Sequence, residues 1–221
     1  HYSTLKKIFS KVGPKKEGRL ISLGDLIDRG PNSAAVLQMF RDNPGFHLIR
    51  GNHEDMMLKC LFRNKNKDCK SWLKYGGLET LKSFGLEPES KMVLADYWCD
   101  FLSNSPSEIV LEKNRLVHAG INPLRSLDDQ TENDRLWSRA VFEFNAAPDP
   151  KRQIFVGHTP TQEIQNHRSA EPWHSDFTTL DGRVAIIALD TGICLEEIHQ
   201  PKLTAYCINT GKFVQEGRIF S

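Results

Sequence analysis

Two acidic side chains and an arginine follow an apolar run in the stretch LISLGDLIDRGP. Asp25 and Asp28 stand three residues apart, Arg29 follows the second acid directly, and glycines flank the group. A carboxylate can bridge two cations because each of its oxygens has spare lone pairs. An arginine can bind phosphate oxygens through two parallel hydrogen bonds. The spacing of the two acids alone first suggests a paired acid/base dyad, although the residue types also suit a metal bridge and a phosphate contact.

The same pattern, an apolar run that ends in polar residues beside glycine, occurs five times, in LISLGD, HLIRGNHE, RLVHAG, IFVGHTP and AIIALDTG. In layered α/β folds, ligands collect where strands end, because the loops converge there. Any one turn could be purely structural, and Asn52 could simply cap a helix that begins at His53. The set favours a site, because Asp25, Asn52, His118 and His158 are oxygen and imidazole ligands suited to Mn, Fe or Zn.

These four side chains could hold one metal ion fully and share a second, with Asp25 as the bridge. Two ions about 3.5–4 Å apart can lower the pKa of a water between them from 15.7 toward ~7, and the hydroxide can attack phosphorus. The leaving alkoxide needs a proton, which His53, next to Asn52, could donate. Asp28 would keep this imidazole charged and oriented. Arg29 would then bind the phosphate oxygens.

The pattern of apolar residues indicates the elements that hold these side chains. Before residue 54 it predicts helix, strand, helix and strand, in STLKKIFSKV, RLISLGD, PNSAAVLQMFRDNPG and FHLIRGNHE. From about residue 54 to 105 it is helical only. After Pro106 strands return, with hairpins in EIVLEKNRLVHAG and KLTAYCINTGKFVQ, and the region from Pro123 to Pro150 is mostly loop with a short helix near LWSRAVFEF. We predict an α/β layered fold and a single domain over residues 1–221, with the helical segment beside the sheet.

Composition excludes several classes of protein. The formal net charge of the 221 residues is +1, so we expect neither a nucleic acid nor an anionic membrane as partner. No apolar run approaches the ~20 residues that span a bilayer, and no signal-peptide pattern is present. The five cysteines are odd in number and lack CxxC spacing, so we expect reduced thiols in a cytoplasmic protein.

Four motifs in order, GDLIDRG, RGNHE, VHAG and VGHT, resemble those of the phosphoprotein phosphatase branch of the calcineurin-like metallophosphoesterases. The WSR stretch at 137–139 and the closing LDTG also fit. The chain is similar to the small bacterial and phage serine/threonine phosphatases, the lambda phage phosphatase among them. This resemblance covers nearly the whole chain and implies a metallophosphoesterase β-sandwich, with two mixed sheets flanked by helices and a helical segment over about 54–105.

The resemblance also implies a role for each candidate site residue. It matches the metal ligands to Asp25, Asn52, His118 and His158, the catalytic acid to His53 with Asp28 as its partner, and the phosphate-binding arginines to Arg29, Arg139 and Arg50. Arg50 could instead form a plain salt bridge, and Arg139 could be a solvated helix charge. The implied cofactors are two divalent metal ions, with manganese first and Fe, Zn, Ni or Co as alternatives.

One motif of the family is missing from the sequence. The family opens with GDxHG, whose Asp and His complete the first metal site, and no such motif stands before GDLIDRG. His1 and Tyr2 match the residues that follow the motif in relatives, so we expect the motif to precede His1 in the full-length protein.

Three functions are consistent with this sequence. The first is metal-dependent hydrolysis of phosphoserine and phosphothreonine in proteins, together with small phosphoesters. The second is symmetrical hydrolysis of diadenosine tetraphosphate, because GGLET at 76–80 resembles the bacterial branch that includes such hydrolases. The third is a metal-poor module that binds phosphate without turnover, which only the missing GDxHG motif supports.

Overall fold

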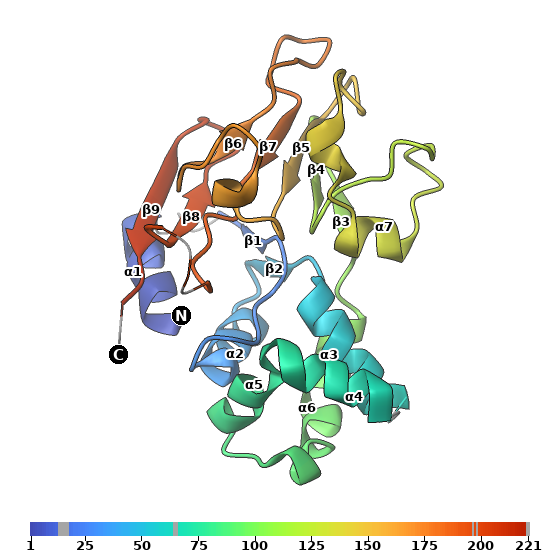
Figure 1. The fold of residues 1–221 in the computed structure, drawn as a ribbon. Coiled ribbons are helices and arrows are strands. Elements are labelled where there is room, and N and C mark those ends of the chain that lie inside the picture. The colour runs from blue at the N-terminus through green and yellow to red at the C-terminus, as the bar shows by residue number, and fades with distance from the viewer. Residues whose placement is uncertain (13–17, 64–65, 196, 198, 220–221) are drawn as a thin grey trace. The chain divides into compact units, whose positions relative to one another are not determined.

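The computed structural model of the chain describes residues 1–12, 18–63, 66–195, 197 and 199–219 (Figure 1). It divides into two compact units. The first comprises His1–Tyr2 and Pro14–Pro106, and the second comprises Ser3–Gly13 and Ser107–Ser221. Among the described residues, no helix has the length and apolar character needed to cross a bilayer.

The first unit combines a short parallel sheet with a group of helices (Figure 1). Strand β1 (Leu20–Ser22) pairs with β2 (Phe46–Leu48), and helix α2 (Ser33–Asp42) forms the crossover that a parallel pair requires. The helices that follow are α3 (Asn52–Arg63), α4 (Asn66–Trp72), η1 (Leu73–Gly77), α5 (Leu78–Ser83), η2 (Pro88–Ser90) and α6 (Val93–Ser103). They correspond to the helical segment that the sequence predicts.

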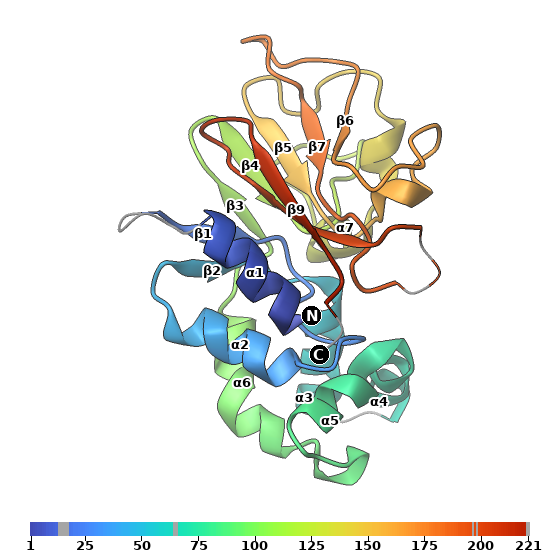
Figure 2. The same ribbon diagram turned by 90° about the vertical axis from the view of Figure 1, so that its left-hand side faces the viewer.

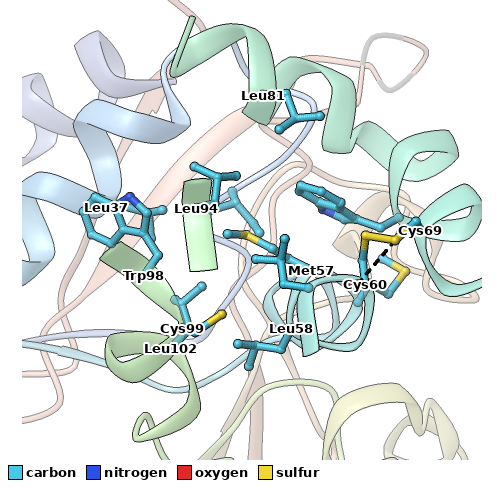
Figure 3. Packing of buried hydrophobic residues seen from close by; sticks show 14 of the residues in the cluster. Leu37, Met57, Leu58, Cys60, Cys69, Leu81, Leu94, Trp98, Cys99 and Leu102 are labelled. Atoms are coloured by element: carbon cyan, nitrogen blue, oxygen red, sulfur yellow. Dashed lines mark hydrogen bonds between the residues drawn. A yellow bond between two sulfur atoms is a disulfide. The ribbon is translucent and has the colours of Figure 1, made fainter. Parts of the chain in front are cut away.

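An apolar core holds these helices together (Figure 3). Leu37 of α2, Met57 of α3 and Leu102 of α6 are all fully buried in it. In α6, Leu94, Trp98 and Leu102 recur every four residues, which places them on one face of the helix. Burial of each such side chain contributes about 1.5–3 kcal/mol, so the core fixes α3, whose first turn carries candidate site residues.

The structure contradicts the expectation that all five cysteines are reduced, because Cys60 and Cys69 form a disulfide (Figure 3). Cys60 lies in α3 and Cys69 in α4, and these two successive helices bring the two Cα atoms to 4.4 Å. This separation is within the range that a disulfide can bridge. The spacing of the two cysteines in the sequence carries no such signal, because it depends on how the two helices pack.

The second unit is built on a mixed five-stranded sheet with the order β3-β4-β5-β7-β6 (Figure 2). The strands are β3 (Glu108–Val110), β4 (Asn114–Val117), β5 (Gln153–Val156), β6 (Trp173–His174) and β7 (Ile186–Ala188). The three central strands, β4, β5 and β7, are parallel, and the two edge strands are antiparallel to their neighbours. All residues of β5 and β7 are buried, as is typical of a sheet covered on both faces. The predicted hairpin of β3 and β4 is confirmed.

A second hairpin lies against this sheet. Strands β8 (Lys202–Tyr206) and β9 (Phe213–Gly217) are antiparallel, as the sequence predicts. The ring of Tyr206 lies 5.3 Å from that of Phe155 in β5. Helix α1 (Tyr2–Val12) lies beside β9 (Figure 2), where Lys7 Nζ is 2.8 Å from a carboxylate oxygen of Glu216. The predicted α/β class with flanking helices is therefore confirmed. Of the two predicted mixed sheets, the described residues form one, because the remaining strands pair only two by two, as β1 with β2 and β8 with β9.

The loops that connect β4, β5, β6 and β7 contain three short helices, α7 (Glu132–Trp137), η3 (Ala140–Glu143) and η4 (Thr161–Glu163). Helix α7 begins earlier than the predicted short helix, because Thr131 and Asp134 form a reciprocal capping box. The chain becomes extended at Ser138, so the predicted single helix is two short ones.

Candidate functional site

Four candidate site residues have a strained backbone. The φ angles of Asp25, Asp28, Arg29 and His158 are 56°, 72°, 59° and 65°. The left-handed region is uncommon for residues other than glycine and costs of order 1–3 kcal/mol per residue. Such residues persist only where the surrounding structure holds them, and they cluster at active and ligand-binding sites. The strain thus indicates, independently of the sequence motifs, that these positions belong to a functional site.

In the first unit, Glu54 holds the turn that carries Asp25. The Glu54 carboxylate is fully buried and accepts hydrogen bonds from the backbone N–H groups of Asp25, Leu26 and Gly51, at 2.9, 2.7 and 2.8 Å. Asp25 Oδ1 in turn accepts from the N–H of His53 at 3.2 Å. Because β1 and β2 are parallel, the turns after them meet at one edge, and Glu54 fixes them to each other.

His53 and Asp28 form a buried pair in the same unit. His53 Nδ1 lies 2.6 Å from Asp28 Oδ2, and the two residues are 2% and 3% exposed. The other carboxylate oxygen of Asp28 accepts hydrogen bonds from Thr80 Oγ1 at 2.6 Å and from Trp72 Nε1 at 3.1 Å. Since Nδ1 is bound to Asp28, the ring nitrogen of His53 that remains for chemistry is Nε2.

The pair favours a protonated His53. Burial lowers the pKa of His53, but the hydrogen bond to Asp28 and the negative charge of Asp25 outweigh it, so the net pKa of His53 is raised. Burial raises the pKa of Asp28, and the hydrogen bonds from His53, Thr80 and Trp72 oppose that rise. A histidine with a raised pKa beside an oriented carboxylate suits a general acid.

The GGLET stretch positions Asp28 and Arg29, a role that the sequence did not reveal. The φ of Gly76 is 120°, and its carbonyl accepts a hydrogen bond from the N–H of Arg29 at 3.3 Å. A Cβ at Gly76 would lie 2.6 Å from that backbone nitrogen, so only glycine allows this approach. Thr80 Oγ1 also accepts from the N–H of Asp28 at 2.9 Å. The two motifs, far apart in sequence, thus form one assembly.

Three other predicted residues lie around this assembly in the first unit. The Arg29 side chain is exposed, as a group that binds a ligand from solvent requires. Asn52 is buried in the first turn of α3, and the helical hydrogen bond from Asp55 N–H goes to the carbonyl of Gly51. Asn52 therefore lies within the helix, one residue after the cap. Arg50 Nη1 donates to the carbonyl of Ser103 at 3.3 Å, which ties it to the end of α6.

In the second unit, two histidines stand at the ends of neighbouring parallel strands. His118 follows β4 directly, and His158 is the second residue after β5. The N–H of Gly157 donates to the carbonyl of His118 at 2.7 Å, and the two imidazole centroids are 5.0 Å apart. The ring of Trp137 lies 5.9 Å from His158, edge to face. Imidazole is a ligand type that Zn, Fe and other transition metals bind.

Arg139 lies at the start of η3 in this second unit and is exposed. Its Nη1 is 3.5 Å from Glu163 Oε2, in an ion pair whose side chains are both about half exposed. An exposed pair of this kind contributes only ~0–1 kcal/mol. The guanidinium is therefore held weakly enough to exchange its partner for a phosphate.

The donor groups in each unit fit divalent metal ions. Asp25 supplies a carboxylate in the first unit, and His118 and His158 supply paired imidazoles in the second. These are ligand types that Mn, Fe and Zn share. The first unit brings Asp25, Asp28 and His53 together, and the second brings His118 to His158. The sequence did not reveal three residues that support the site, Glu54, Trp72 and Thr80. Glu54 belongs to the motif RGNHE and Thr80 to GGLET, whereas Trp72 belongs to no motif noted in the sequence.

A family model described as calcineurin-like phosphoesterase matches residues 1–189. The chain belongs to the calcineurin-like phosphoesterase family. Members of this metallophosphoesterase family use divalent metals, which agrees with the donor groups described above.

Curated relatives of the family include serine/threonine-protein phosphatase 2 of Escherichia coli (strain K12), which is 45% identical over 58 residues, 26% of this chain and 25% of that one. The serine/threonine-protein phosphatase 2B catalytic subunit A2 of Saccharomyces cerevisiae is 26% identical over 193 residues, 78% of this chain and 28% of that one. The matches to curated relatives span between 17% and 38% of the relatives' length.

Two solved structures share the fold of this chain. A provisionally assigned diadenosine tetraphosphatase matches with a TM-score of 0.66 and 17% identity, over 98% of this chain and 88% of that one. A metallophosphoesterase from Sphaerobacter thermophilus matches with a TM-score of 0.54 and 16% identity, over 99% of this chain and 84% of that one. At this level of identity the likeness concerns the fold alone, and it agrees with the predicted metallophosphoesterase class.

Proposed function

We propose that the protein is a metal-dependent phosphatase that removes phosphate from phosphoserine and phosphothreonine in proteins and also hydrolyses small phosphoesters. The observation that carries this proposal is the buried pair of His53 and Asp28, beside Asp25 and the exposed Arg29 in one unit. The serine/threonine phosphatases among its relatives support the choice of substrate.

In this proposal His53 protonates the leaving oxygen through Nε2, while Asp28 holds the opposite ring nitrogen and stabilises the imidazolium. Arg29 and Arg139 bind the phosphate oxygens, which guanidinium groups match with two parallel hydrogen bonds. Arg50, tied to the end of α6, has the weaker case for contact with the substrate.

Asp25, Asn52, His118 and His158 would hold two divalent ions, with Mn²⁺ as our first choice. This ligand set follows from the four motifs and from the donor types. When bound, the ions would lower the pKa of a water and stabilise negative charge on the phosphate.

A direct test is hydrolysis of a phosphoserine peptide by the full-length protein with added Mn²⁺, comparing wild type with Asp25→Asn. Equal rates for the two proteins would refute the assignment of Asp25. His53→Asn should slow esters with poor leaving groups more than those with good ones, because a good leaving group needs little protonation. An equal loss on both substrates would mean that His53 is not the acid.

A second candidate is hydrolysis of diadenosine tetraphosphate, which the fold of the first structural neighbour supports. The GGLET stretch does not distinguish this reaction from protein dephosphorylation, because the stretch supports Asp28 and both reactions would use Asp28. Kinetics on diadenosine tetraphosphate and a phosphopeptide, measured side by side, discriminate between the two. A metal-poor binding module is the third candidate, and two metal equivalents per chain by elemental analysis would exclude it.

A further inference from the structure

A cavity of about 890 Å³ lies within the second unit, outside the residues assigned so far apart from Arg139. Its walls include four half-buried aromatic side chains, Phe142, Phe144, Trp173 and Phe177. They come from η3 and the residue after it, from β6, and from the segment that follows β6. We call this cavity the aromatic pocket. Its volume is in the range of pockets that bind small ligands.

The aromatic pocket adjoins the phosphate-binding part of the proposed site. Arg139 lies in its wall, and so does Thr159, the residue directly after His158. The Thr159 hydroxyl is buried, and no hydrogen-bond partner for it exists among the residues that the structure describes. A buried hydroxyl without a partner is unfavourable, so this wall has an unused polar group as well as a cation next to the candidate ligand His158.

The pocket has an excess of negative charge. Three acids line it, Glu143, Glu163 and Asp176, and only Glu163 is neutralised, by Arg139. Glu143 and Asp176 are exposed and form no ion pair with any residue in the described ranges. At neutral pH the pocket therefore carries two acids that form no ion pair with the residues that the structure describes.

The aromatic walls are also suited to a cation. The rings of Phe142 and Trp173 meet edge to face, with centroids 5.3 Å apart, and both remain partly accessible. An ammonium or guanidinium group over an aromatic face is attracted by the ring quadrupole. The neighbouring His174 adds little positive charge, because burial and then the charge of His167 lower its pKa.

We propose that the aromatic pocket binds an arginine or lysine side chain of the phosphorylated protein substrate. The inference rests on the proposed function, because it assigns to that site a preference for substrates with a basic residue near the phosphoserine. Glu143 and Asp176 pair with the cation, the aromatic rings pack against its aliphatic stem, and the phosphate lies on the Arg139 side. An adenine base would also stack on the rings, but it would leave the two acids without a partner.

The test compares kcat/KM for phosphoserine peptides in which one arginine is moved through the positions flanking the phosphoserine in an alanine background. The full-length protein with Mn²⁺ is used, and p-nitrophenyl phosphate serves as a substrate that has no basic side chain to place in the pocket. At the best position the arginine should raise kcat/KM about tenfold over the all-alanine peptide, the scale of one partly desolvated cation on an aromatic face. The gain should appear mainly in KM.

Variants connect this preference to the pocket. Glu143→Gln with Asp176→Asn should reduce the arginine preference to about threefold or less. The matched control Asp128→Asn, an exposed acid of the same unit outside the pocket, should keep it. Neither change should alter the rate on p-nitrophenyl phosphate. Because the substituted acids are exposed, folding is retained, and a melting temperature for each variant confirms it.

The outcomes separate the inference from the proposed function. Hydrolysis of the peptides with no preference for arginine at any position overturns the inference and leaves the function standing. If the pocket instead binds adenine, Trp173→Ala should abolish diadenosine tetraphosphate hydrolysis and leave the peptide rates unchanged, and that result would also overturn the inference. Absence of hydrolysis of every phosphoester refutes the proposed function itself.

Discussion

Thr80→Val removes one hydroxyl from the assembly around Asp28 and changes little else. Valine has nearly the shape of threonine, so no cavity is expected at this fully buried position. The hydroxyl donates to Asp28 Oδ1 at 2.6 Å and accepts from the N–H of Asp28 at 2.9 Å. The substitution therefore tests whether GGLET holds the carboxylate that orients His53.

The loss of stability in Thr80→Val depends on which hydrogen bonds Asp28 retains. The N–H of Asp28 still donates to Ser33 Oγ at 3.1 Å, so it does not lose its last partner. The carboxylate keeps Trp72 and His53 but loses one of its donors. A hydrogen bond to a charged group contributes about 1.5–3 kcal/mol. We expect the free energy of unfolding to fall by about 2 kcal/mol.

The same loss should affect catalysis. Burial already raises the pKa of Asp28, and removing the Thr80 donor raises it further, which weakens the hold on a protonated His53. If the weaker interaction between Asp28 and His53 raises the activation free energy by about 1.4 kcal/mol, hydrolysis of an ester with a poor leaving group slows about tenfold. An ester with a good leaving group should slow less, because it needs less protonation.

Urea unfolding at neutral pH measures the stability effect, and steady-state kinetics on the two esters measures the catalytic one. Thr80→Ser is the matched control, because serine keeps the hydroxyl and loses only the methyl group. Valine should be more destabilising than serine, and only valine should change the ratio of rates on the two esters. Equal stability and equal ratios for the two variants would refute the role assigned to Thr80.

Three further predictions concern other parts of the chain. Gly76→Ala should lower the free energy of unfolding by more than about 1 kcal/mol. Gly85→Ala is the control and should lower it less, because φ is also positive there but a Cβ would meet nothing within 4 Å. Urea unfolding of the two variants measures the difference. Replacing Cys60 and Cys69 by serine should lower the free energy of unfolding by about 3 kcal/mol. A reductant should change the urea midpoint of the wild type but not that of the serine variant. Hydrogen bonds from two lysines of α1 lower the pKa of Glu216. The stability that the Glu216 carboxylate contributes is therefore present above pH 4.5 and is lost as the pH falls through its folded pKa. The difference in melting temperature between wild type and Glu216→Gln should shrink on acidification.

Local patterns sufficed for much of the fold. The hairpin of β8 and β9 follows from two β-rich stretches around an Asn-Thr-Gly turn, and α2 follows from its apolar spacing. The short strand β6 was missed, because its pairing with β7 depends on the sheet and two residues carry no period. The disulfide was missed for a similar reason, since a contact between two helices is not encoded in the spacing of its cysteines.

The candidate site divides in the same way. Residues that would touch a metal or phosphate are chemically distinctive and stand at strand ends, so Asp25 and His53 can be found from the sequence. The residues that hold them lie in helices, and their spacing in the sequence does not show that they contact the site. Thr80 and Trp72 follow Asp28 by 52 and 44 residues, and only the packing of α4 and α5 shows that their side chains converge on its carboxylate.

The strain in the turn after β1 has a consequence for which substitutions matter. Asp25, Asp28 and Arg29 all lie in the left-handed region, which together costs roughly 3–9 kcal/mol. Close to the turn, the N–H of Gly30 donates to the carbonyl of Asp28, and the N–H of Asp28 donates to Ser33 Oγ at the start of α2. The other compensating hydrogen bonds come from Glu54 in α3, which binds backbone N–H groups of the turn, and from Thr80 in α5. The turn therefore keeps its geometry only while both helices are in place, so substitutions at their buried polar positions should disturb the site without touching any ligand residue.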